Sequence, residues 1–72
     1  NPVTDWLNVA TMDAEPTTIT IVSSTGKVIY DETSEVSAFE PARIDMSTCA
    51  PGQYAVSVSF GGNEYKRTIV KL

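Results

Sequence analysis

Apolar and polar residues alternate with period 2 in the most regular stretches of this chain. In QYAVSVSF, residues 53–60, every second residue from Tyr54 to Phe60 is apolar, and the residues between them are small. In TTITIV, residues 17–22, isoleucines alternate with threonines and every residue is β-branched. Successive side chains of a strand point to opposite faces, so this pattern predicts strands with one buried and one exposed face. β-Branched residues also favour strands over helices.

Turn residues separate these stretches from other short segments. Further strands are expected in WLNVA (6–10), KVIYDET (27–33), ARIDMS (42–47) and EYKRTIVKL (64–72). Turns are expected at SSTGK (23–27), where Gly26 is free to adopt positive φ, and at GGN (61–63), typical of a tight hairpin. SEVSAFEPA (34–42) is polar and contains Pro41, which predicts a loop or a weak edge strand. STCAP (47–51) could form one helical or 3₁₀ turn, with Ser47 as its cap.

Short strands separated by turns at this spacing predict an all-β protein, a small antiparallel Ig-like β-sandwich of about six to seven strands. No stretch carries a helical apolar stripe longer than two turns. The inward-facing positions of the expected strands form the predicted core. These residues are Leu7, Val9, Ile19, Ile21, Val28, Ile44, Met46, Tyr54, Val56, Val58 and Phe60.

Length and charge limit the function classes. The chain has 72 residues, enough for one domain, and a formal net charge of −4. An acidic balance argues against nucleic acid and anionic membranes, which attract basic patches. No apolar run is long enough to cross a bilayer. The chain begins with Asn1 rather than Met and shows no signal peptide, so we expect residues 1–72 to be a single domain of a longer protein.

Cys49 is the only cysteine, and it is either a working thiol or a core residue. A catalytic cysteine needs a base or a cationic neighbour that lowers its pKa. The chain has no histidine, and no Lys or Arg lies within five residues of Cys49. We therefore expect Cys49 to be buried and unreactive, with an intermolecular disulfide as the alternative.

The acidic residues Asp31, Glu32 and Glu35 are the other candidate for chemistry. Calcium loops place their oxygen ligands at alternating positions with a glycine between them, and this cluster lacks that spacing. A solvated loop is the preferred interpretation. The residues thus predict no enzyme, no cofactor and no metal site.

The order of the segments supplies a resemblance. Asn1-Pro2, Gly26-Lys27-Val28, Ile44-Asp45, Gly52-x-Tyr54 and Ile69-Val70-Lys71 follow one another along nearly the whole chain. This series resembles the C-terminal sorting domain of cargo proteins of the type IX (Por) secretion system of certain Gram-negative bacteria. Met46 and Cys49 stand where that family usually has leucines, which agrees with a core position for Cys49.

The resemblance implies that residues 1–72 are the C-terminal domain of a longer secreted protein. It further implies a secretion signal that directs a passenger protein to the cell surface or the medium, through the periplasm. The implied partners are secretion machinery proteins and an upstream passenger domain. The alternative is an Ig-like structural or binding module of a secreted or surface-anchored protein, because such modules share the Gly-x-Val-Ile-Tyr hairpin and the Gly-x-Tyr strand. The residues expected to form the sorting motif are Gly26, Lys27, Gly52, Tyr54, Lys66, Arg67, Ile69, Val70 and Lys71.

The basic residues of the last strand have two interpretations. Lys66, Arg67 and Lys71 are three of the five basic residues in the chain. They could be a charged edge that prevents edge-to-edge pairing. The resemblance instead implies that the machinery reads the terminal strand and its basic end. In both cases we expect these charges to be exposed, so that their reversal leaves stability nearly unchanged.

Overall fold

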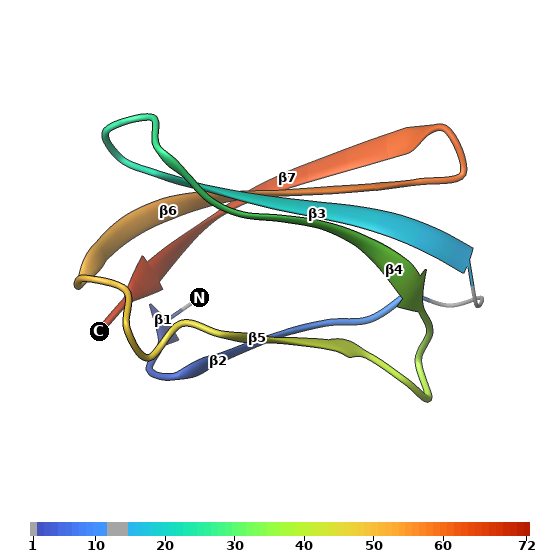
Figure 1. The fold of residues 1–72 in the computed structure, drawn as a ribbon, viewed down its shortest axis with the longest axis horizontal. Helices are drawn as coiled ribbons and strands as arrows, with labels where there is room; N and C mark the ends of the chain where they lie inside the picture. The colour runs from blue at the N-terminus through green and yellow to red at the C-terminus, as the bar shows by residue number, and fades with distance from the viewer. Residues whose placement is uncertain (1, 12–14) are drawn as a thin grey trace.

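A computed structural model describes residues 2–11 and 15–72, which form seven β-strands in two layers (Figure 1). The strands are β1 (Pro2–Val3), β2 (Trp6–Val9), β3 (Glu15–Ser23), β4 (Val28–Val36), β5 (Ala42–Asp45), β6 (Gly52–Phe60) and β7 (Asn63–Lys71). The larger sheet has the order β1-β7-β6-β3-β4, and β2 pairs with β5 in the smaller sheet. All pairs are antiparallel except β1 with β7. The predicted small all-β sandwich is confirmed. No helix in the described residues is long and apolar enough to cross a membrane.

Both expected hairpins of the larger sheet are present. Gly61 and Gly62 adopt φ values of 55° and 78° between the paired residues Phe60 and Asn63. Two successive residues at positive φ define the type I′ turn that suits the twist of a tight hairpin. The β3–β4 turn contains Gly26 at φ 88°, as expected.

Side chains from both sheets meet in one core. The fully or nearly buried apolar residues are Val3, Ile19, Ile21, Val36, Ile44, Met46, Tyr54, Val56 and Ile69. Six of the predicted core residues are in this set, and Leu7, Val9 and Val58 pack against it while remaining partly exposed. The period-2 pattern therefore identified the inner face of both sheets correctly over most of their length.

Val28 was wrongly predicted as a core residue. Its side chain is 54 % exposed. The β3–β4 pairing shifts between Ile21 and Val22, so that Ile21 faces Tyr30 whereas Val22 faces Val28. A bulge of one residue moves the following side chains to the other face of the strand. Ile29 consequently packs against the core in place of Val28.

Phe60 also lies outside the buried core. It is half-buried, and its ring stacks on Tyr65 with 5.4 Å between ring centroids. The smaller sheet has strands of four residues, whereas β6 and β7 have nine each. At about 3.3 Å per residue the short strands cannot cover the far end of the long ones.

The segment 34–42 was expected to be a loop or a weak edge strand, and residues 34–36 do belong to an edge strand, because β4 continues to Val36 and is the last strand of the larger sheet; Val36 is 1 % exposed. The acidic residues 31, 32 and 35 are therefore on a strand rather than a loop, and all are exposed. Alternation places Glu32 on the opposite face to Asp31 and Glu35. Within residues 2–11 and 15–72, no three acidic, Cys or His side chains are grouped to hold a metal ion.

Residues 47–49 form one turn, and the hydrogen bond that closes it spans three residues, as in the expected 3₁₀ turn. The Cys49 amide donates to the Met46 carbonyl, and the Ser47 amide donates to the Asp45 carboxylate at 2.9 Å. The Asp45 carboxylate therefore accepts the hydrogen bond from the turn backbone, which is the capping role that was expected of Ser47. Cys49 packs against the core, as expected of a core residue, but it is only half-buried rather than buried. Its reactivity remains a prediction.

Asp45 gives this turn a predicted pH dependence. Hydrogen bonds from the side chain and backbone of Ser47 hold the pKa of the Asp45 carboxyl below its ordinary value of 3.8. A pKa that is lower in the folded state contributes stability above the unfolded-state pKa, and this contribution is lost as the pH falls through the folded-state pKa. We expect Asp45→Asn to have a less steep fall in Tm below about pH 4 than the unmodified chain, as measured by thermal melts across that range. Equal slopes would show that the carboxylate does not stabilise the turn.

Candidate functional site

Most of the expected motif residues meet at one end of the larger sheet. Gly52 pairs with Lys71, and Tyr54 pairs with Ile69. Tyr54 also pairs with Ser23, the last residue of β3. The turn that contains Gly26 and Lys27 follows directly, so three segments distant in sequence lie at this end (Figure 1).

The β3–β4 turn is held by its own backbone. The Ser23 amide donates to the Lys27 carbonyl at 2.8 Å, and the Gly26 amide donates to the Ser23 carbonyl at 2.9 Å. Ser23 Oγ also accepts from the Lys27 amide. Lys27 is exposed, so a rigid turn presents its charged side chain to solvent.

Gly52 and Tyr54 define the start of β6. Gly52 has φ 149°, a backbone conformation that residues with a side chain rarely adopt, and it follows directly after Pro51. The Tyr54 ring is buried, and its hydroxyl donates to the Ala50 carbonyl across the turn. A buried hydroxyl needs a partner, and this bond supplies one.

Burial divides the motif residues into two groups. Tyr54, Ile69 and Lys71 are buried, with exposed fractions of 7 %, 2 % and 7 %. The others are exposed and available to a partner: Gly26, Lys27, Gly52, Lys66, Arg67 and Val70. The first group is held in the fold, and only the second can present side chains or backbone to another protein.

The expected exposure of Lys71 is wrong. Alternation in β7 directs Lys71 to the same inner face as Ile69, next to Val3, its partner in β1. Its Nζ donates to the carbonyl oxygen of Leu72 at 3.0 Å. Charge reversal at Lys71 would place a carboxylate in a nearly buried position and would therefore destabilise the fold. A loss of export in such a variant could not be assigned to a sorting signal alone.

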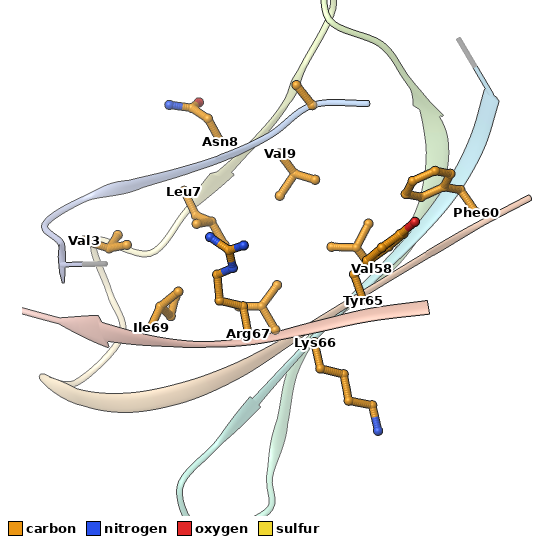
Figure 2. Close-up of a pocket in the computed structure, with 12 residues that line it drawn as sticks. Val3, Leu7, Asn8, Val9, Val58, Phe60, Tyr65, Lys66, Arg67 and Ile69 are labelled. Carbon is orange, nitrogen blue, oxygen red and sulfur yellow. The ribbon is translucent and has the colours of Figure 1, made fainter. Parts of the chain in front are cut away.

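Lys66 and Arg67 lie in the middle of β7 and point to opposite faces of the sheet, as Figure 2 shows. Lys66 is largely exposed on the outer face, where its Nζ lies 3.7 Å from Glu64. The Arg67 side chain points into the space between the two sheets. The basic residues of the last strand thus do not form one patch, and both interpretations of their role stay predictions.

An open groove of about 750 Å³ runs between β2 and the β6–β7 hairpin (Figure 2). Its lining is mostly apolar and includes Leu7, Val9, Val58 and Ile69, with Arg67 on the β7 side. The stacked rings of Phe60 and Tyr65 stand at one end. The groove exists because β2 and β5 are too short to cover β6 and β7.

Leu72 is not among the residues expected to form the sorting motif. It follows β7 and is 62 % exposed, and the residue two positions before it, Val70, is 38 % exposed. Alternation places both side chains on the outer face, on either side of the inward-facing Lys71. The sequence shows two apolar residues among its last three positions. That their side chains lie on one face follows only when this segment is assigned to a strand.

Comparison with protein families gives one match. The family model described as "Secretion system C-terminal sorting domain" matches residues 1–72, the whole chain. No curated protein and no solved structure matches the chain significantly.

Proposed function

This chain belongs to the family of secretion system C-terminal sorting domains, and we propose that the exposed end of its larger sheet is the surface that the export machinery reads. A domain of this family is a sorting signal for type IX secretion, which delivers its passenger protein to the cell surface or the medium. The family is one of sorting signals rather than enzymes. The proposed route passes through the periplasm, and the proposed partners are machinery proteins and an upstream passenger domain.

The convergence of motif residues at one sheet end is the observation that supports this proposal. Lys27 on the rigid turn and Val70 on the outer face of β7 come from opposite halves of the chain. Both remain exposed, and Leu72 adds a second apolar side chain beside Val70. We call Lys27, Val70 and Leu72 the sorting surface.

The buried motif residues have a different proposed role. Tyr54 and Ile69 pair across β6 and β7 directly behind the sorting surface. Lys71 anchors the end of β7 against β1. We propose that these three residues, with Gly52, hold the end of the sheet in shape, and that Lys66 and Arg67 contribute outside the sorting surface.

A reporter fusion tests the function. Residues 1–72 are placed at the C-terminus of a passenger-like periplasmic reporter, in a host with type IX machinery. We expect the reporter to reach the surface or the medium, because the domain itself is the sorting signal. Cell fractionation with a protease-accessibility assay measures its location.

The control is the same reporter without the domain, which should stay in the periplasm. If the fused reporter also stays there while protease resistance shows that the domain is folded, the proposal fails. That result would favour the alternative, an Ig-like structural or binding module.

A further inference from the structure

Most of β7 forms an open edge of the larger sheet. In the described residues, β1 pairs only with Val70 and Lys71, although β7 begins at Asn63. An open strand edge leaves backbone donors and acceptors without partners, and such an edge readily accepts another strand. The open edge extends over residues 63–69.

The direction of β1 determines how that edge could be filled. β1 runs parallel to β7, with Pro2 beside Val70, and the Leu72 amide donates to the Val3 carbonyl at 2.8 Å. Backbone groups of alternate residues in a strand point to the same neighbour. The even-numbered residues from Glu64 to Thr68 therefore direct their N–H and C=O groups to the same edge as Leu72.

The side chains at this edge define the groove described above. Val3 at the end of β1 and Ile69 and Arg67 on β7 all line it. Figure 2 shows Val3 and Ile69 at one end of the groove and Tyr65 at the other. A strand that continued β1 backwards along β7 would pass along the whole groove and cover its apolar lining.

We propose that the residues immediately before the first residue of this chain continue β1 as a parallel strand along β7 and close the groove. The inference rests on the proposed function, because a sorting domain is attached to a passenger upstream of it. The occupant is thus the final segment of the passenger linker, and continuity with the β1–β7 pairing fixes its direction and register. Extending that register places the second residue before the chain beside Arg67 and the fourth beside Tyr65.

The proposed strand has a predictable side-chain pattern. Neighbouring residues of parallel strands point to the same face, and Val3 and Lys71 both face inward. The residues beside Tyr65 and Arg67 consequently face the groove. The first and third residues before the chain face solvent.

Amide hydrogen exchange on the purified passenger–domain protein tests the proposal. We compare the native protein with a variant in which the six residues before the chain are replaced by a Gly-Ser sequence of equal length. The even-numbered amides from Glu64 to Thr68 should exchange about tenfold more slowly in the native protein, as expected for a hydrogen bond that is made in one case only. The odd-numbered amides from Tyr65 to Ile69, which face β6, serve as the internal control and should be slow in both proteins.

Disulfide trapping gives a second measurement. With Cys49→Ala as background, a cysteine placed at the second residue before the chain should cross-link to Arg67→Cys, because paired residues in adjacent strands lie within disulfide reach. The matched control is Lys66→Cys, which points to the other face and should cross-link much less.

Equal exchange of the even-numbered amides in both proteins, or equal cross-linking at positions 66 and 67, would overturn the proposal. Protection that rises with protein concentration would also overturn it, since the occupant would then be a second copy of the chain. Both measurements are made without the secretion machinery. A failed export assay therefore does not contradict the proposed strand. Likewise, a failed exchange or cross-linking experiment does not contradict the proposed sorting function.

Discussion

Replacing Val70 with aspartate is expected to abolish export of the fused reporter while the domain stays folded. Val70 is 38 % exposed on the outer face of β7, so a carboxylate at this position remains in contact with water. Its structural cost is the low preference of aspartate for strands, about 1 kcal/mol or less. The new charge lies on the proposed sorting surface and would have to be desolvated on binding. Reporter location and Tm are measured on the same variant.

Thr68→Asp is the matched control for this prediction. Thr68 lies two residues earlier on the same face of the same strand and is exposed. The substitution has the same cost in strand preference as Val70→Asp and adds the same charge, but the charge lies outside the sorting surface. Export should continue in Thr68→Asp. If both variants are exported, or both fail at equal stability, β7 does not carry a signal localised at Val70.

Tyr54→Ala is expected to unfold most of the domain and thereby to stop export. The Tyr54 ring is 7 % exposed and belongs to the core cluster formed by both sheets. Removing a buried aromatic ring costs about 3 kcal/mol or more. A domain of this size has about 3–5 kcal/mol of stability in total. Chemical denaturation followed by circular dichroism measures the loss.

Tyr54→Phe separates the ring from its hydroxyl. This variant keeps the buried ring and loses only the hydrogen bond to the Ala50 carbonyl, a loss of about 1 kcal/mol. It should remain folded and exported. A Tyr54→Ala domain that melts within a few degrees of the original would contradict the central place of this residue in the core.

Alternation along single strands was sufficient to predict much of the fold. The residues of QYAVSVSF and TTITIV alternate clearly because one face of each strand is covered by the smaller sheet. Gly26 and the Gly61–Gly62 pair predicted two turns correctly, because the backbone at these positions has positive φ, which glycine adopts easily. The family resemblance, carried by the order of short motifs, was confirmed over the whole chain.

The remaining features depend on contacts between strands. A bulge opposite Val22 turned Val28 outward, and nothing within KVIYDET reveals the register of its partner. The burial of Lys71 depends on β1, which returns from the other end of the chain to lie beside it. Phe60 continues the alternation perfectly, but its exposure is determined by the length of a sheet elsewhere in the sequence. For the candidate site, the sequence alone did not show which of the expected motif residues are buried and which are exposed, because that division depends on the fold.

The other edge of the larger sheet has a consequence for solubility. β4 is the last strand on that side, and its exposed residues include Asp31, Glu32 and Glu35. Two copies that approached through β4 would bring six carboxylates together, and their mutual repulsion opposes the pairing that starts aggregation. Growth of the sheet by pairing at β4 is therefore disfavoured. Many copies can therefore share a crowded compartment without joining through β4.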